Sequence, residues 1–179
     1  MLVLSLRLQK LDTMSFQVAP ICQRGGLDAG STATSTTTET TTERPKCPHG
    51  WETYTDDGSS VKCFKYSRDT VAFAIYAEDN CRALGGHLAS IHSIEEQNFL
   101  MQTFNPPDGV WIGAVDPDHN GVWEWMDGSG FDFSYWIPGD EPDGGSYYTV
   151  MDFQYYYDGY WNDLSYNYSY YGYICQLAL

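Results

Sequence analysis

An α+β domain is the fold class that the sequence predicts for residues 47–179. Two stretches with helical spacing of apolar residues come first, at residues 70–84 and 93–104. Short apolar and aromatic runs, separated by glycine, aspartate, asparagine and proline, follow beyond residue 108 and are typical of strands joined by loops. Because helices and strands do not alternate, we do not expect a parallel sheet with crossover helices.

The first predicted helix covers Thr70 to Leu84. Its apolar residues recur at spacings typical of one helix face, at Phe73, Ala77, Cys81 and Leu84. We expect Asp69 or Thr70 to cap its start, because short polar side chains accept the first free backbone N–H groups. The glycine pair 85–86 supplies a left-handed stop.

The second predicted helix begins at Ser93. Glu96 lies three residues further on, and this pairing is typical of a capping box. The apolar residues that it presents are Ile94, Phe99, Leu100 and Phe104. The proline pair 106–107 ends it. Strands are then expected at Val110–Val115 and Val122–Met126.

The composition changes abruptly at Cys47, because all six tryptophans and all fifteen tyrosines lie beyond it. Residues 1–30 show no usable periodicity, and their apolar start is interrupted at Arg7, so no clear signal peptide is visible. Residues 31–46 are rich in threonine, which is typical of an O-glycosylated stalk or a plain flexible linker. We predict an N-terminal segment of unclear role at 1–30, a stalk or linker at 31–46 and one domain at 47–179.

The chain carries 24 acidic and 9 basic side chains, a formal net charge of -15. This balance argues against binding to nucleic acid or to anionic lipid, both of which need a basic face. No apolar run reaches the length of about 18 residues that spans a membrane. Twenty acidic and four basic residues belong to residues 47–179, so a cation is the natural partner of the domain.

Four of the five cysteines lie in the domain, and Cys22 is left over for a free thiol or an intermolecular bond. None forms a CxxC pair, so a disulfide framework in an extracellular protein is favoured over a zinc site. Four cysteines allow three pairings. One of them joins Cys47 to Cys63 across a short hairpin, and Cys81 to Cys175 between the first helix and the last strand.

Several motifs of the domain resemble those of the C-type lectin-like domains. In chain order they are CPHGW at 47–51, AEDNCRALGGHLASIHSIEEQNFL at 77–100, VWIGAVD at 110–116, GVWEWMDG at 121–128, WND at 161–163 and YICQ at 173–176. Each motif is modest, but six in the right order are highly specific. The resemblance implies two helices, two small antiparallel sheets and a long irregular ligand loop, together with the disulfides Cys47–Cys63 and Cys81–Cys175.

A calcium and carbohydrate site is implied by the same resemblance. In the family, a Glu-Pro-Asn or Gln-Pro-Asp triplet and the Asn-Asp of WND bind Ca²⁺, and two sugar hydroxyls complete the shell. Carried over to this chain, the ligands of both metal and sugar are Glu141, Asp143, Asn162 and Asp163. These residues offer hard oxygens, which calcium prefers. A cis bond before Pro142 would direct the two loop carboxylates to one side.

The loop also departs from the family pattern. Glu-Pro-Asp is a hybrid of the mannose-type and galactose-type triplets, and its leading glutamate favours mannose-type glycans. Trp136 and Glu141 are separated by one more residue than usual, and Ser146 takes the place of an expected acid. An acidic loop without metal is the alternative, and it would make the chain a calcium-independent protein- or mineral-binding module.

Other motifs are given structural interpretations. Residues 116–127 nearly fit an EF-hand loop, but their flanks are predicted strands, so we interpret them as a hairpin turn. His87 and His92 are interpreted as packed or surface histidines. No nucleophile–base pair or phosphate loop is visible, so an enzyme is not expected. Eleven tyrosines lie between 147 and 173, and Asn167 begins an N-glycosylation sequon. The sequence thus predicts a secreted, calcium-dependent, glycan-binding recognition domain.

Overall fold

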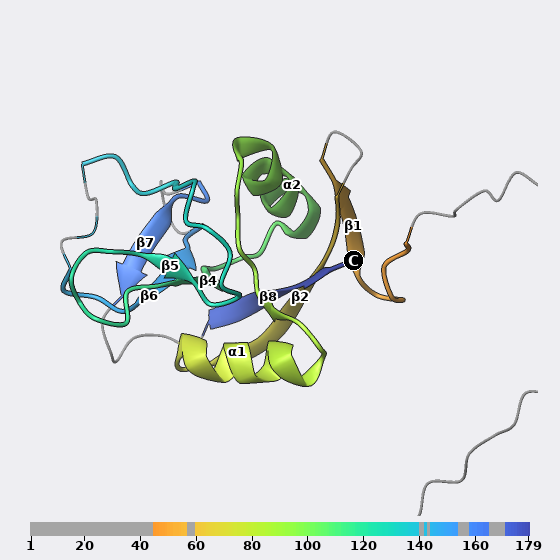
Figure 1. Ribbon diagram of the computed structural model, residues 1–179, viewed down its shortest axis with the longest axis horizontal. Coiled ribbons are helices and arrows are strands. Elements are labelled where there is room, and N and C mark those ends of the chain that lie inside the picture. Colours follow the sequence, from red (N-terminus) through yellow and green to blue (C-terminus); the bar gives the residue numbers. More distant parts are fainter. Residues whose placement is uncertain (1–44, 57–59, 140–141, 143, 154–157, 165–170) are drawn as a thin grey trace, which may run out of the picture. The chain divides into compact units, whose positions relative to one another are not determined.

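The computed structural model describes residues 45–56, 60–139, 142, 144–153, 158–164 and 171–179. Its elements follow the chain in the order β1 (Glu52–Thr55), β2 (Val61–Val71), α1 (Ala74–Ala83), β3 (His87–Leu88), α2 (Ile94–Phe104), β4 (Val110–Val115), β5 (Glu124–Trp125), β6 (Tyr148–Met151), β7 (Trp161–Leu164) and β8 (Tyr171–Ala178). In Figure 1, α1 and α2 lie on opposite sides of β2 and β8. The α+β class and the two helices are confirmed.

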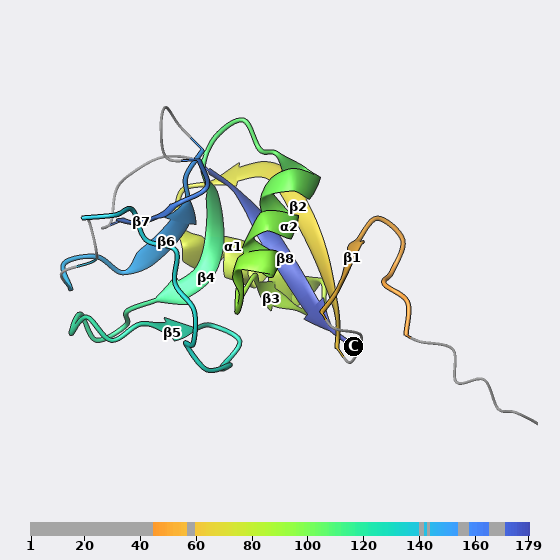
Figure 2. The ribbon, with the colours of Figure 1, turned by 90° about the horizontal axis from the view of Figure 1, so that it is seen from above.

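The described strands form one sheet in the order β1-β2-β8-β4-β6-β7, with β3 paired to β8 and β5 paired to β4. Two antiparallel groups were expected, and a short parallel pairing of β4 with β8 joins them, at Val110↔Gly172 and Trp111↔Tyr173. Figure 2 shows β4–β7 gathered at one end of the domain, away from β1 and the C-terminus. The two small antiparallel sheets that the resemblance implied are thus joined into one sheet.

The start of α1 also differs from the prediction. Asp69 and Thr70 belong to β2 and are exposed, and the helix begins only at Ala74, after an N-cap residue, Phe73, that makes no side-chain cap. Pairing of β2 with β8 extends to Val71, so strand pairing outcompetes an early helix start. The predicted glycine stop is confirmed, with Gly85 at φ 88°.

The capping box of α2 is confirmed in its main feature. The Ser93 side chain accepts the backbone N–H of Glu96, and Glu96 in turn accepts the backbone N–H of His92. The predicted apolar face is correct at Leu100, which is fully buried, but Ile94 is exposed. Glu96 and Gln97 are buried instead, so the inner face of α2 is partly polar.

Both disulfides form as the family resemblance implied. Cys47 is joined to Cys63 and Cys81 to Cys175, and the second bond spans 94 residues. It links α1 to β8, so the end of the domain's chain is tied to its first helix.

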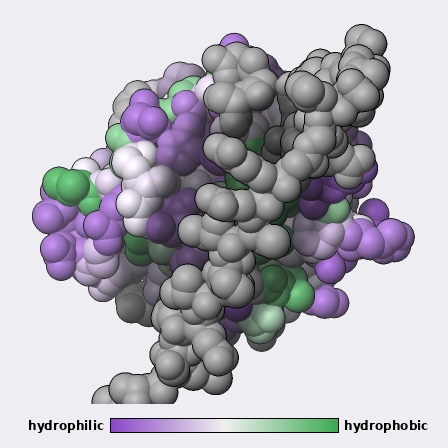
Figure 3. Space-filling view, turned by 45° about the vertical axis from the view of Figure 1, so that its right-hand side comes forward, coloured by the Kyte–Doolittle hydropathy of each residue, from purple (hydrophilic) through white to green (hydrophobic). Residues whose placement is uncertain are grey.

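Two groups of buried side chains form the core. The first contains Phe64, Leu100, Ile112, Trp123, Trp125, Met151, Trp161 and Ile174 among others. The second packs α1 on the sheet through Ala74, Ala77, Cys81, Leu88, Trp111 and Val150. Leu84, predicted to face the core, is 48% exposed because it follows the last turn of α1. Most of the coloured surface in Figure 3 is hydrophilic. Neither described helix is long and apolar enough to cross a membrane.

All described residues belong to one compact unit, Thr42–Leu179. Residues 1–44, with Cys22, lie outside the described residues. The predicted boundaries at residues 30 and 46 stay predictions.

Candidate functional site

Strand β7 carries the WND motif and lies at one end of the sheet order. It pairs with β6 through Met151↔Trp161, Val150↔Asn162 and Thr149↔Asp163. Its first residue, Trp161, also bridges Trp136 on the other side. Beyond Trp161, the outer edge of β7 has no bridge partner in the part of the chain that the structure describes. Among the described residues, Asn162 and Asp163 therefore lie on the edge strand of the sheet.

The beginning of β7 is held firmly by buried contacts. The indole N–H of Trp161 donates to the side-chain oxygen of Gln97 at 2.9 Å, and the backbone N–H of Trp161 donates to the carbonyl of Tyr135 at 2.7 Å. The amide nitrogen of Gln97 donates to the carbonyl of Gly159 at 2.8 Å. A Cβ on Gly159 would lie 2.7 Å from the sulfur of Met101. Helix α2 thus fixes the turn that precedes β7.

The two WND ligand candidates point to opposite sides of β7, because side chains alternate along a strand. Asp163 shares its face with Thr149, its partner across the ladder, and Asn162 shares the other face with Val150. Both side chains are half-buried. An ion that meets oxygens from both must therefore lie along the edge of β7 that β6 does not occupy.

A buried hydroxyl lies beside this edge. Thr149 is fully buried, and its Oγ has no hydrogen-bond partner among the described residues. Thr149 and Asp163 therefore place a hydroxyl and a carboxylate on the same face of the β6–β7 ladder.

The predicted ligands Glu141 and Asp143 lie outside the described residues, and so does the peptide bond before Pro142. The structure does describe both ends of their loop. Trp136 packs its ring on Trp161, with centroids 5.5 Å apart. At the other end, a Cβ on Gly144 would lie 3.2 Å from the backbone nitrogen of Gly121. The loop therefore starts beside β7 and returns against the turn after β4.

The turn between β4 and β5 is not an EF-hand, because its buried aspartate binds the backbone of the turn itself. Asp116 is fully buried and accepts the backbone N–H groups of Asn120 and Gly121 at 3.2 and 2.8 Å. Strands β4 and β5 flank it and pair antiparallel. The hairpin interpretation is confirmed.

As a calcium site, the described residues supply one amide oxygen and one carboxylate. No group of three His, Cys, Asp or Glu side chains occurs within the described ranges. Calcium takes six to eight oxygens, so the ion would need the loop carboxylates as well as Asn162 and Asp163. The chemistry of the donors fits calcium, and the four-residue assignment stays a prediction.

Aromatic rings line the approach to β7. Tyr135 stacks on Tyr160, with ring centroids 4.4 Å apart and planes 7° from parallel. Burial raises the pKa of Tyr135, and the hydrogen bond to Tyr160 adds to this. Residues 155–157, which are all tyrosines, and the sequon residue Asn167 lie outside the described residues.

No sequence pattern indicated the carboxylates that lie beside the two histidines. His87 lies 2.7 Å from Glu78, and His92 lies 2.7 Å from Asp132. Asp132 follows His92 by 40 residues, so no local spacing signals the pair.

Comparisons with known proteins complete the description of this region. A family model described as the lectin C-type domain matches residues 70–177. The Type-2 ice-structuring protein of Hemitripterus americanus is 41% identical over 105 residues, 59% of this chain and 60% of the relative. The galactose-specific lectin nattectin of Thalassophryne nattereri is 41% identical over 101 residues, 54% of this chain and 59% of the relative.

Among solved structures, the chain is similar to the cow C-type carbohydrate-recognition domain of CD23, determined in the presence of a GlcNAc2Man3 oligosaccharide. The TM-score is 0.63 at 32% identity, over 75% of this chain and 97% of that one. The chain spans about three fifths of the length of the curated relatives described above.

Proposed function

The chain belongs to the family of C-type lectin domains, and from this premise we propose that it binds carbohydrate through a calcium ion at the open edge of β7. The single observation that carries the proposal is the placement of Asn162 and Asp163 on an edge strand beside the start of an acidic loop. An ion at this edge would be reachable both by the loop and by a ligand from solvent.

The proposed roles follow from the chemistry of each residue. Asp163 and the loop residues Glu141 and Asp143 provide negative charge, and Asn162 provides a neutral amide oxygen. Bound calcium would supply an electrophilic centre at which two neighbouring sugar hydroxyls can coordinate. The three carboxylates would accept hydrogen bonds from those hydroxyls, and the amide nitrogen of Asn162 would donate one. Mannose-type glycans are the proposed class, because Glu141 leads the triplet.

A thermal shift experiment tests the metal half of the proposal. Calcium should raise the melting temperature of the full chain, since a ligand bound only by the folded state stabilises it. Asp163→Ala should abolish the rise. Asp79→Ala is the matched control, because Asp79 is an exposed aspartate on α1, and it should keep the rise. An unchanged melting temperature with calcium in the wild-type chain would refute the proposal.

A glycan array with and without calcium tests the sugar half. Binding to mannose-type glycans should occur in calcium and disappear in EDTA. Asp163→Ala should bind nothing in either buffer, and Asp79→Ala should behave as the wild type. Binding that persists in EDTA would contradict a calcium-bridged mechanism.

A second candidate is a calcium-independent protein- or mineral-binding module. The chain is 41% identical both to an ice-structuring protein and to a lectin. Overall sequence similarity therefore does not discriminate between the two functions, and the second candidate is retained. Ice is the mineral surface that this relative suggests. Thermal hysteresis of the purified chain, measured in EDTA, separates the two: activity there supports the second candidate, and its absence together with calcium-dependent glycan binding supports the first.

We propose that the protein is an extracellular, non-enzymatic glycoprotein. The two disulfides support it, because such bonds persist in oxidising compartments. The partners would be glycans or glycoproteins, with no nucleic acid, given the net charge of -15. Oligomers through Cys22 or the stalk belong to the same proposal, as does a glycan on Asn167.

A further inference from the structure

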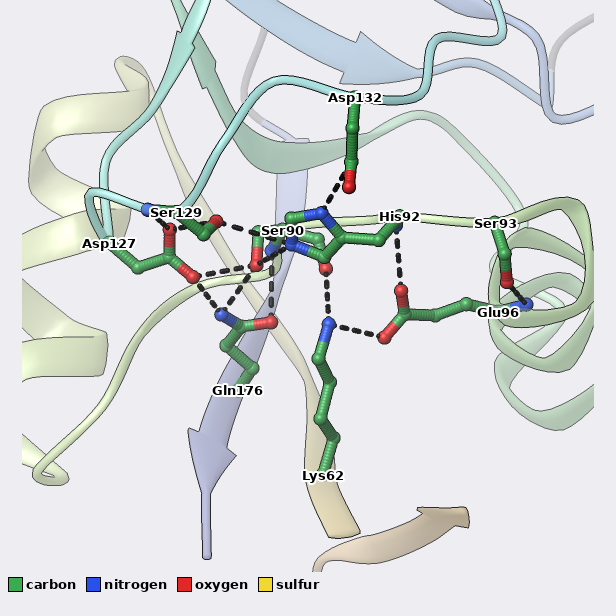
Figure 4. A network of polar contacts seen from close by, with 9 residues as sticks. All are labelled: Lys62, Ser90, His92, Ser93, Glu96, Asp127, Ser129, Asp132 and Gln176. Carbon is green, nitrogen blue, oxygen red and sulfur yellow. Dashed lines mark hydrogen bonds and ion pairs between the residues drawn. The ribbon is translucent and has the colours of Figure 1, made fainter. Parts of the chain in front are cut away.

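Polar side chains surround His92, which lies just before α2 (Figure 4). Ring atom Nδ1 lies 2.7 Å from a carboxylate oxygen of Asp132. Ring atom Nε2 lies 3.1 Å from Oγ of Ser90 and 3.2 Å from Oγ of Ser129. With Asp127, these residues form what we call the His92 cluster. The ring thus bridges the segment before α2 and the segment after β5.

Asp127 determines where the serine protons point. The hydroxyls of Ser90 and Ser129 each lie 2.6 Å from its carboxylate, and the backbone N–H of Ser129 and the side-chain amide of Gln176 also donate to it. Burial raises the pKa of Asp127, but the hydrogen bonds from Ser129 and Ser90 and the charge of His92 outweigh burial and lower this pKa below its ordinary value. Asp127 is therefore an ionised acceptor, and each hydroxyl uses its single proton on it.

The ring must then provide the remaining hydrogens. A hydroxyl oxygen whose proton points at Asp127 can only accept, so Nε2 of His92 donates to Ser90 and Ser129. An ionised Asp132 can also only accept, so Nδ1 donates as well. A ring with hydrogens on both nitrogens is an imidazolium. We propose that His92 is a positioning residue whose doubly protonated ring ties the start of α2 to residues 127–132, and that losing one ring proton releases one side of the tie.

Charged groups from each neighbouring element face the ring. The two carboxylates of the cluster come from residues 127–132. Glu96 of α2 accepts the backbone N–H of His92 at 2.7 Å, and Lys62 of β2 pairs with Glu96 at 2.6 Å. Asp56 shares with these residues a hollow of about 340 Å³ that His92 also lines. The hollow gives solvent a route to the ring, and the His92 side chain is 23% exposed.

The contact between His92 and Asp132 affects ligand binding through the residues that follow Asp132 in the chain. This part of the inference rests on the proposed function. Phe133 packs against Trp161, with ring centroids 5.8 Å apart, and the carbonyl of Tyr135 accepts the backbone N–H of Trp161. The chain then enters the acidic loop. A firm anchor at residue 132 therefore holds one entrance of the loop beside β7, and preorganised ligands bind more tightly than mobile ones.

Imidazole NMR spectra of the full chain test the proton count. Spectra at about pH 5.5 and about pH 8 bracket the range in which histidines change charge. We expect hydrogens on both nitrogens of His92 at the lower pH and on one at the higher pH. Backbone amide signals of residues 127–133 should move with this change. Asp132→Asn should suppress most of that movement, because it removes the carboxylate acceptor.

A matched control is available in His87→Gln. His87 has a carboxylate partner at the same 2.7 Å, but it joins β3 to α1 and not the segment after β5. Its loss should leave the amide movement of residues 127–133 intact. A His92 ring that keeps the same number of hydrogens at both pH values, or amides there that do not respond to it, overturns the proposal.

Calcium titrations of the wild type and His92→Gln test the link to the ligand edge. Because the carboxylate ligands also titrate, the ratio of the two dissociation constants at each pH is the readout. We expect the variant to bind about two- to fivefold more weakly at the lower pH, the range of an exposed ion pair, and nearly equally at the higher pH. An equal ratio at both values overturns the link. No calcium binding by either protein would refute the proposed function, while the NMR result would stand.

Discussion

Replacing Gln97 by leucine tests whether α2 fixes the strand that bears the candidate ligands. The Gln97 side chain is fully buried and bridges two buried groups, the indole N–H of Trp161 and the carbonyl of Gly159. Leucine has a similar volume but can neither accept nor donate. The substitution therefore deletes two hydrogen bonds and leaves two buried polar groups without partners.

The expected cost follows from those two groups. A buried donor or acceptor that loses its partner costs about 1–3 kcal/mol, and the leucine recovers part of this by burying apolar surface. The free energy of unfolding should fall by about 2–4 kcal/mol. For a domain of this size, that loss lowers the melting temperature by roughly 10 °C.

Urea unfolding followed by tryptophan fluorescence measures this effect, with the disulfides kept oxidised. Gln102→Leu is the control, because Gln102 is an exposed glutamine of the same helix, and it should change the free energy by less than about 0.5 kcal/mol. A loss below about 1 kcal/mol for Gln97→Leu, or one equal to the control, would refute the idea that this side chain anchors β7.

Two further predictions concern the rest of the domain. Replacing both cysteines of Cys81–Cys175 should lower the free energy of unfolding by about 4–5 kcal/mol, and replacing both cysteines of Cys47–Cys63 should lower it by about 3 kcal/mol. The costs differ because the first disulfide closes a loop of 94 residues and the second a loop of 16. Urea unfolding that ranks the two variants the other way would contradict the loop-entropy reasoning. The pKa of Asp127 is lowered in the folded state, so its contribution to stability is present above the ordinary aspartate pKa of about 3.9 and is lost as the pH falls through the folded value. Asp127→Asn should therefore flatten the melting temperature profile below about pH 4, and a profile as steep as that of the wild type would count against this role.

Local patterns in the sequence predicted the features that depend on local chemistry. The Ser93 and Glu96 spacing gave the start of α2, and the glycine pair gave the end of α1, because both act within one helical turn. The start of α1 was predicted too early, since the pairing of β2 with a strand a hundred residues away decided it. Helix periodicity cannot anticipate such a partner.

The polar interior escaped prediction for a similar reason. Gln97 and Glu96 are buried on α2, where a pattern of apolar residues alone points to other positions. The backbone N–H of Ser90 donates to the side-chain oxygen of Gln176, 86 residues away in the chain. A buried polar side chain needs a hydrogen-bond partner, and that partner often lies far away in the sequence. The spacing of residues in a single sequence does not show which donors and acceptors will meet. The motif resemblance located the candidate ligands but not the contacts that hold them.

Asp163 also has a structural reason to be where it is, because charged residues on an edge strand discourage pairing with other chains. Asp163→Lys separates this role from calcium binding. The variant keeps a charge on the edge of β7 but removes a ligand oxygen and adds a positive charge. We expect it to stay monodisperse in size-exclusion chromatography and to lose the calcium-dependent rise in melting temperature. A variant that aggregates would show that the aspartate itself protects the edge, and one that still responds to calcium would show that the ion binds elsewhere.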